Sequence, residues 1–433
     1  MSRGVRGALA VLAVAAVLRL ALHAVFLPAF EGPDEPHHLA RVLAFASEPA
    51  AAAFAGRTVA PAIVAAVRAR PCGPSLARAY GCSPFGPERA MFNVLSPSSA
   101  AAAAEARDTP EGNQPPLFYL LAGLPLRLAG AVPGPEGLLL YARLFNVLLV
   151  AIAIFGPLRA IAAARPPVYA ALFLLALLLP GAAESLARSA NDASVFLWST
   201  FVLLGLDRRW RGSAVAALLA AGPLLKLTAF PIVAFAVVAL WQERRTRAAL
   251  AGAAASCTVF LVQGLRGWNW GGTVELNHPT AAISEGTIAL AAGLARSVCA
   301  FAKTTFWLGG WSFFRAPGAL VAAFALLILA WVLGARRLAR PSRGLAHLAA
   351  AATAAAGFLA FALANRRFFG VWGGVGGWYA WAWWPWIVVG LADVASVSRK
   401  ASRALLAATA VFVLVANVLW FAAAVGLYGT LAG

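Results

Sequence analysis

Long apolar stretches separated by short arginine clusters are the feature of this sequence that most limits its fold. The first stretch, Ala8 to Phe30, is long enough for a helix to cross the ~30 Å hydrocarbon core of a bilayer. Similar stretches recur along the 433 residues, of which 62% are hydrophobic and 12% charged. A soluble domain averages about 45–50% apolar and about 25% charged residues. The chain is therefore predicted to be an all-α polytopic membrane protein.

The arginine clusters also predict which loops face the cytoplasm. Arg3 and Arg6 precede the first apolar run, so the N-terminus is expected inside. If the short apolar stretch 116–128 lies along the outer surface, every later compact arginine cluster between spans falls inside as well. This choice predicts about 11 spans. They are 8–30, 137–158, 168–183, 194–206, 212–225, 227–241, 249–265, 318–333, 345–364, 379–397 and a last span that ends outside. We expect one transmembrane domain over residues 1–433, with extracytoplasmic regions at 31–136 and 266–317. The first of these regions is expected to contain short helical pieces such as 39–55 and 98–107. Spans 212–225 and 227–241 are expected to form a hairpin with Lys226 at its outer, wet tip.

Charge and cysteine content narrow the class of protein further. The formal net charge is +19, but the basic residues sit in short clusters between apolar runs, which is typical of cytoplasmic loops and not of a nucleic-acid surface. Cys72 and Cys82 lie in the predicted first outer loop, where a disulfide between them is expected. Cys257 and Cys299 lie in apolar surroundings and are expected to pack as small hydrophobic residues.

One polar stretch, Glu31 to Arg41, stands out directly after the first predicted span. It holds three of only 16 acidic residues and two of only five histidines. Pro36 suits the first turn of a helix, so Asp34 or Glu35 is expected to cap a helix that begins here. Two interpretations remain open: a helix cap with solvated neighbours, or a catalytic site at the membrane surface with Asp34, His38 and Arg41 on one helix face.

Further landmarks follow in order along the chain. Gly-Pro-Asp-Glu-Pro-His-His at 32–38 is followed by Gln-Pro-Pro-Leu-Phe-Tyr at 114–119 and Tyr-Ala-Arg-Leu-Phe-Asn at 141–146. Ser-Ala-Asn-Asp at 189–192 and Lys-Leu-Thr at 226–228 complete the series. This order resembles the DUF2142 group of bacterial membrane proteins, within the GT-C superfamily of polyprenyl-phosphate-dependent glycosyltransferases. The resemblance covers roughly residues 5–400. Where that group tends to show Gly-Arg-Tyr, this chain has Gly-Gly-Trp-Tyr, ending at Tyr379.

The resemblance implies a GT-C-like bundle in the bacterial cytoplasmic membrane, with its active site on the extracytoplasmic side. It implies a sugar donor linked to polyprenyl phosphate and a glycan, lipid or protein acceptor. A carboxylate, Asp34 or Glu35, would take the proton of the acceptor hydroxyl, and cations would hold the leaving phosphate. The residues expected to bind substrate are His37, His38, Arg41, Gln114, Tyr119, Arg143, Arg188, Asn191, Asp192, Lys226, Arg366, Arg367 and Tyr379.

Several alternatives stay open at the level of sequence. A divalent cation bridging Asp34, His38 and Asp192 is one of them, although the spacing does not support it. A transporter or flippase for a lipid-linked glycan would place ionisable groups near the bilayer midplane, whereas here they gather in the predicted outer loops. A non-catalytic scaffold for envelope assembly is a third reading. The tryptophan-rich segment 372–386 is expected to form an interfacial aromatic belt, with a sugar or lipid platform as the alternative.

Overall fold

The computed structural model describes residues 3–32, 34–49, 58–70, 114–163, 167–268, 287–306, 317–324, 341–369, 379–395 and 399–428, with a few single residues and short pieces between them. The elements run α1 Arg3–Phe26, α2 Glu35–Ser47, β1 Thr58–Val59, α4 Pro61–Arg68, β2 Arg107–Asp108, α6 Leu117–Ala129 and α7 Pro135–Ala153. A π-turn, Ile154–Leu158, and α8 Arg159–Ala162 extend α7. Then come α9 Pro167–Leu177, α10 Pro180–Ala187, α11 Asp192–Asp207, α12 Gly212–Leu225, η4 Leu227–Ala229, α13 Phe230–Gln242, α14 Thr246–Trp268, α15 Thr287–Phe306, α17 Pro341–Phe369, α18 Tyr379–Ala395 and α19 Arg399–Tyr428.

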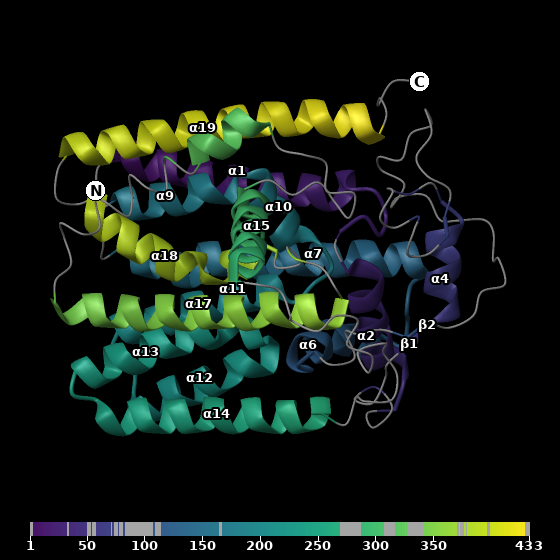
Figure 1. Cartoon of the computed structure of the whole chain (residues 1–433), viewed down its shortest axis with the longest axis horizontal. Helices are drawn as coiled ribbons and strands as arrows, with labels where there is room; N and C mark the ends of the chain where they lie inside the picture. The colour runs from purple at the N-terminus through teal and green to yellow at the C-terminus, as the bar shows by residue number, and fades with distance from the viewer. Residues whose placement is uncertain are drawn as a thin grey trace.

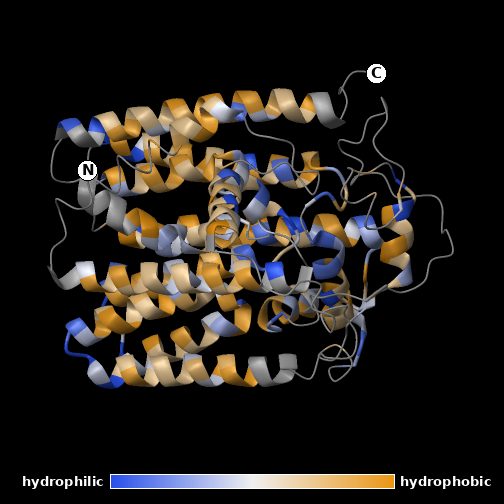
Figure 2. Ribbon diagram, in the orientation of Figure 1, coloured by the Kyte–Doolittle hydropathy of each residue, from blue (hydrophilic) through white to orange (hydrophobic). Residues whose placement is uncertain are grey.

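Most of the long helices lie side by side in a bundle. In Figure 1, α1, α7, α14, α17 and α19 run along the long axis, and α15 crosses them near the middle. Elements α2, α4, β1, β2 and α6 gather at the end opposite to the one where α1 begins. Hydrophilic residues are concentrated at the ends of the bundle and where α2, α7 and α10 meet (Figure 2). The bundle therefore has polar ends and a polar interior region, separated by apolar helix.

Three arginine-containing turns meet at one end of the bundle. Arg208 donates a hydrogen bond to the carbonyl oxygen of Ala160 at 3.2 Å, which joins the α11–α12 turn to α8. Arg245 donates to the carbonyl oxygen of Trp210, which joins the α13–α14 turn to the same place. Their grouping at a single end is what the predicted topology requires, because it assigned all three turns to the cytoplasm.

Among the described residues, fewer helices qualify as membrane spans by length and composition than the sequence predicts. Four helical stretches in the described part of the chain qualify: Arg3–Phe26, Pro135–Ala162, Gly344–Leu363 and Arg403–Val425. A fifth is the pair α9 and α10, bent by 76° at Pro180, where we predicted one continuous span over 168–183. Four further apolar helices are shorter. The predicted count of about 11 spans is not confirmed, and half of the predicted span 318–333 lies outside the described residues.

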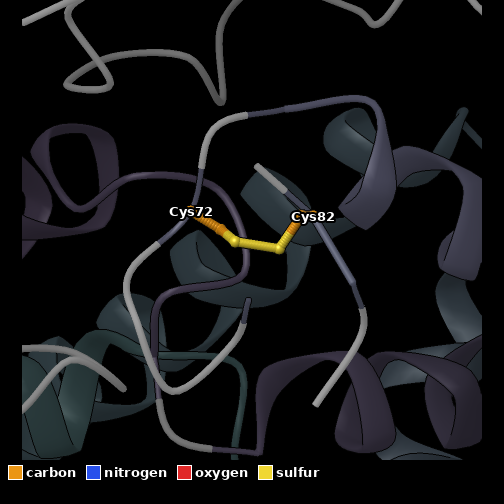
Figure 3. The surroundings of a disulfide bond; sticks show 2 residues. All are labelled: Cys72 and Cys82. Atoms are coloured by element: carbon orange, nitrogen blue, oxygen red, sulfur yellow. A yellow bond between two sulfur atoms is a disulfide. The ribbon is translucent and has the colours of Figure 1, made fainter. Parts of the chain in front are cut away.

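The first polar region is built from short elements. Helix α2, Glu35–Ser47, begins where a helix starting at Pro36 is predicted and ends before the predicted helical piece 39–55 does. β1 pairs antiparallel with β2, with Thr58 opposite Asp108. Cys72 and Cys82 form a disulfide, the pairing that the sequence predicts (Figure 3). The helix predicted near residues 98–107 lies almost wholly outside the described residues.

Close approach of α2 and α6 depends on a glycine. A side chain at Gly123 would meet the Cβ atom of Phe45 at 2.8 Å and the backbone nitrogen of Ala46 at 3.0 Å. Without a Cβ atom at this position, the two helices pack tightly, and this brings Tyr119 of α6 against His38 of α2.

The tryptophans of α18 pack inside the bundle, so the expected aromatic belt is wrong for them. Trp381, Trp384 and Trp386 are buried. The indole nitrogen of Trp381 donates to the carbonyl oxygen of Thr305 at 2.8 Å, and that of Trp386 donates to His347 at 2.8 Å. These rings hold α18 against α15 and α17 and do not lie at a lipid headgroup surface.

Candidate functional site

Asp34 stands at the start of α2 but does not cap it. Its φ angle is 62°, in the left-handed region, and its side chain makes no capping hydrogen bond. Its carbonyl oxygen instead accepts hydrogen bonds from the backbone nitrogens of His37 and His38, both at 3.0 Å. Asp34 is half-buried. The cap interpretation therefore fails for this side chain, and a non-glycine residue in a strained conformation is more common at functional sites than elsewhere.

Glu35 has a different environment from Asp34. Its carboxylate is buried and accepts four hydrogen bonds: from Arg143 Nε at 2.7 Å, Arg143 Nη2 at 2.6 Å, Ser189 N at 2.9 Å and Gly32 N at 2.9 Å. Arg143 is also buried and donates to the carbonyl oxygens of Ala24, Leu27 and Pro28. This pair ties α2 to α7 and to the end of α1. Arg143, expected to hold a phosphate, is committed to structure, and so is Glu35.

His38, Tyr119 and Arg41 form a second contact set on α2 and α6. The His38 Nδ1 atom lies 2.6 Å from the Tyr119 hydroxyl. The Arg41 guanidinium lies 5.5 Å from the centre of the Tyr119 ring and donates to the carbonyl oxygen of Ala53 at 2.7 Å. His38 and Arg41 thus share a helix face, as predicted, and Tyr119 lies between them.

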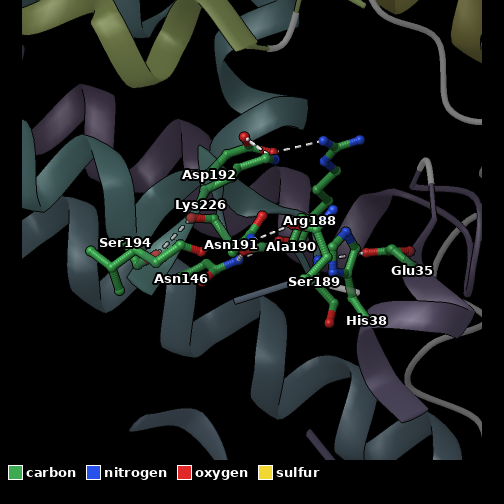
Figure 4. A network of polar contacts seen from close by, with 12 residues as sticks. Glu35, His38, Asn146, Arg188, Ser189, Ala190, Asn191, Asp192, Ser194 and Lys226 are labelled. Atoms are coloured by element: carbon green, nitrogen blue, oxygen red, sulfur yellow. Dashed lines mark hydrogen bonds and ion pairs between the residues drawn. The ribbon is translucent and has the colours of Figure 1, made fainter. Parts of the chain in front are cut away.

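Asp192 joins two buried cations (Figure 4). Its Oδ2 atom accepts from Arg188 Nη2 at 2.7 Å, and its Oδ1 atom accepts from Lys226 Nζ at 2.6 Å. All three side chains are buried. We expected Lys226 at a wet hairpin tip. The α12–α13 hairpin forms as predicted, but its tip packs onto the start of α11, so Lys226 is enclosed.

The sequence landmarks converge on this network. Asn146 of α7 donates to the carbonyl oxygens of Arg188 and Ala190, which fixes the turn between α10 and α11. Asn191 donates to Gln114 Oε1 at 3.2 Å and to the carbonyl oxygen of Leu225 at 3.0 Å. Segments 32–38, 114–119, 141–146, 189–192 and 226–228 therefore meet in one place, although they are far apart in sequence.

The C-terminal half contributes Tyr379 to this network. The contacts described here do not place Arg366 or Arg367 in it. The Lys226 ammonium lies 4.9 Å from the centre of the Tyr379 ring, so an aromatic face lies near the cation, at the tyrosine that directly follows the departure from the Gly-Arg-Tyr pattern. Arg366 is half-buried on α17, and the hydrogen bonds described above for Asp192 and Lys226 do not involve it. The side chain of Arg367 lies outside the described residues.

Charges in the network set the protonation of its members. Burial, together with the positive charges of Lys226, Arg188 and His37, lowers the pKa of His38 well below 6.5. His38 is therefore neutral near pH 7 and can accept or donate a hydrogen bond to Tyr119. Burial opposes the charge of Arg188, but Asp192 and, to a lesser extent, Asp34 raise its pKa.

Among the described residues, no group of three or more His, Cys, Asp or Glu side chains is arranged to hold a metal ion. Asp34, His38 and Asp192 do not form such a group. The divalent cation considered from sequence stays an untested alternative.

A second polar cluster, which the sequence reading missed, lies inside the membrane-spanning part. Arg19 of α1 donates to Asn417 Oδ1 of α19 at 3.2 Å, and Asn417 donates to the carbonyl oxygen of Leu178 at the α9–α10 bend. His23 lies next to Arg19. Glu184 of α10 interacts electrostatically with Arg19. His23 and Glu184 are buried. The available signal was an arginine and a histidine one helical turn apart within an apolar run.

Comparison with known proteins places the chain in a family. The family model described as "predicted membrane protein (DUF2142)" matches residues 17–430. The chain belongs to the DUF2142 family. No curated protein and no solved structure matches it. Membership agrees with the predicted membrane protein class and with the landmarks from which the resemblance was drawn. It does not extend to the GT-C superfamily, for which the comparisons supply nothing.

Proposed function

We propose that this DUF2142 protein is a GT-C-type glycosyltransferase of the bacterial cytoplasmic membrane. It would move a sugar from a polyprenyl-phosphate donor to an extracytoplasmic glycan, lipid or protein acceptor. The observation that carries the proposal is the contrast between two neighbouring carboxylates. Glu35 is buried and fully hydrogen-bonded, whereas Asp34 is half-buried, does not cap its helix, and lies within electrostatic reach of Arg188.

Asp34 has the properties of a general base for this reaction. The acceptor hydroxyl oxygen would attack the anomeric carbon, its proton would pass to the Asp34 carboxylate, and the bond from that carbon to the phosphate oxygen would break. The polyprenyl phosphate leaves with the bonding electrons, and the configuration of the anomeric carbon inverts. Of the two candidates from sequence, Asp34 is the base, because every oxygen of Glu35 is engaged by Arg143, Ser189 and Gly32.

Arg188 and Lys226 are the cations that would stabilise the departing phosphate. Asp192 accepts hydrogen bonds from both, so the pair is held in place and partly neutralised. Asp34, His37, Gln114 and Tyr379 are the half-exposed members of the site. A substrate phosphate would pass them and share the two cations with Asp192.

The orientation proposed here puts the site outside. The turns that carry Arg208 and Arg245 lie together at one end of the bundle, and α2 and α4 lie toward the other. The first cysteine of the disulfide, Cys72, follows shortly after the end of α4 at Arg68. By the distribution of arginine, the first end faces the cytoplasm. The disulfide agrees with an extracytoplasmic location for the opposite end.

Transfer of labelled sugar from membrane lipid tests the function. Cells that lack the protein should lose incorporation into an outer-surface acceptor, and the parent chain should restore it. Asp34→Asn should not restore it, although the protein accumulates in the membrane. Full rescue by Asp34→Asn would remove the basis of the proposed mechanism.

The cluster around Arg19 favours a second candidate, a transporter or flippase for a lipid-linked glycan. We argued from sequence that the ionisable groups gather in outer loops. The structure corrects this, because Arg19, His23 and Glu184 lie in or beside helices long enough to span, where buried ionisable groups often mark transport paths. Chemical labelling of lipid-linked glycan on the outer face with an impermeant hydrazide separates the two functions. If the protein is a transporter, cells with Glu184→Gln should lose the labelled glycan on the outer face. If it is a transferase, cells with either Glu184→Gln or Asp34→Asn should keep it.

A further inference from the structure

Helix α6 has two faces, and both are mainly apolar; the one charge is Arg127 in the last turn of the exposed face, which donates to the carbonyl oxygen of Glu48 at 3.0 Å. One face packs against the protein through Phe118, Tyr119, Ala122, Gly123 and Leu126. The other is exposed and carries four leucines: Leu120, Leu121, Leu124 and Leu128. A helix lying in water would carry polar residues on its exposed face. The exposed leucines therefore need an apolar environment.

Lipid supplies that environment, because α6 touches a helix that spans the membrane. The Tyr141 hydroxyl of α7 donates to the carbonyl oxygen of Ala122 at 2.8 Å. The exposed residues of α7 are also apolar: Leu144, Leu148, Ile152 and Phe155. With 13 residues, α6 is about 20 Å long and cannot cross a ~30 Å hydrocarbon core. It is a short helix with a mainly apolar exposed face, joined to α7 by this hydrogen bond.

The N-terminal end of α6 lies beside the buried cations. Asn191 contacts both Gln114, just before α6, and Leu225, the last residue of α12. α6 also packs against α12. Lys226 follows Leu225, and the next residue, Leu227, is 43% exposed although it is apolar. Exposed apolar side chains are thus found both on α6 and at the residue adjoining Lys226.

An amphiphile with an anionic head and an apolar chain matches this arrangement. We propose that the exposed face of α6, together with Leu227, binds the isoprenoid chain of a polyprenyl monophosphate while its phosphate contacts Lys226 and Arg188. This inference rests on the proposed function and names the part of the substrate that α6 recognises. The face of α6 that binds the chain is opposite to the face that holds Tyr119 against His38, so the helix links the lipid to the catalytic residues.

Photocrosslinking in the full-length protein tests the binding surface. A benzophenone amino acid would replace Leu121 or Leu124 on α6 and, as a matched control, Leu414 on the lipid-facing side of α19. The protein would be placed in phosphatidylcholine nanodiscs with a trace of radiolabelled C55 polyprenyl monophosphate. Parallel samples would carry radiolabelled C55 polyprenol or phosphatidic acid. These two probes separate the contributions of the apolar chain and of the phosphate.

Polyprenyl monophosphate should label the two α6 positions about tenfold more than position 414, the ratio expected from one charge-assisted hydrogen bond to the phosphate. Polyprenol and phosphatidic acid should label all three positions alike. Lys226→Gln removes the charge but keeps a donor for Asp192, and it should abolish the preference for α6. Equal labelling at all three positions by polyprenyl monophosphate, or a preference that survives Lys226→Gln, would show surrounding lipid only and overturn the proposal.

The same samples separate this proposal from the proposed function. If crosslinking is selective for α6 but the Asp34→Asn variant still transfers sugar, the lipid site is supported and the role of Asp34 as general base is rejected. If Asp34→Asn loses transfer but crosslinking is not selective for α6, the transferase function is supported and the lipid site on α6 is rejected.

Discussion

Glu35 and Arg143 are joined by two hydrogen bonds of 2.7 and 2.6 Å, and both side chains are closed to solvent. A buried ion pair that loses one partner leaves an uncompensated charge, which costs about 3–5 kcal/mol. Glu35→Gln should therefore lower the temperature of unfolding in nanodiscs strongly. Combining Glu35→Leu with Arg143→Met should recover part of the loss, because no charge then remains buried. A Glu35→Gln protein as stable as the parent would contradict the structural role.

Asp34 should respond differently, because its backbone is left-handed and its side chain caps nothing. Asp34→Asn tolerates the same backbone, and Asp34→Gly relieves it, so the free energy of unfolding should stay level or rise by up to about 1 kcal/mol with glycine. Glycosyl transfer should fall by about 10²–10⁴ in both variants, the usual effect of losing a general base. Thermal unfolding and sugar transfer, measured on the same preparation, check the two outcomes together.

His38 predicts a pH dependence of stability. Its pKa lies well below 6.5 in the folded protein, mainly because of burial and then because of nearby positive charges. As the pH falls through 6.5, the unfolded chain takes up a proton that the folded chain does not. This contribution to stability is complete above pH 6.5 and is lost below it, by up to about 1.4 kcal/mol per pH unit.

The His38→Gln variant is the control for that measurement. Glutamine can still bond to the Tyr119 hydroxyl but does not titrate. Unfolding temperatures of the variant should therefore fall less between about pH 6.5 and pH 5 than those of the parent. Parallel curves for the two proteins would show that another group is responsible.

The disulfide should stabilise the first outer region. Cys72 and Cys82 are separated by ten positions, and closing so short a loop contributes on the order of 2–3 kcal/mol. Mass spectrometry after non-reducing digestion should find the two peptides linked, and Cys72→Ser with Cys82→Ser should unfold at a lower temperature. Free thiols at both positions in normally exported protein would contradict the pairing.

Topology can be checked by thiol labelling in intact cells. In a cysteine-free background, single cysteines at Arg209 and Arg245 should resist an impermeant reagent, because their turns meet at the end assigned to the cytoplasm. A cysteine at Asp108, in β2, should react. The sequence makes the same prediction of protection for Arg340, which lies outside the described residues. Labelling of Arg209→Cys and Arg245→Cys from outside would reverse the orientation.

The sequence by itself determined the membrane class, the family, the α12–α13 hairpin and the pairing of Cys72 with Cys82. These features depend on local composition, on order along the chain or on a short loop, all of which can be read one segment at a time. Hydropathy adds up residue by residue, and a disulfide between near neighbours needs no knowledge of distant helices.

Only the tertiary structure decided which charged groups are free to act. Glu35 and Asp34 are neighbours of the same chemical type, yet the first pairs with Arg143, 108 positions away. Lys226 is enclosed because α11 brings Asp192 to it, and Arg19 meets Asn417 because α1 and α19 lie near the α9–α10 bend. Burial and pairing depend on which distant helix packs against a residue. That packing depends on local shape at sites such as Gly123, where α6 meets α2. The periodicity of the sequence does not indicate which helix packs at such a site.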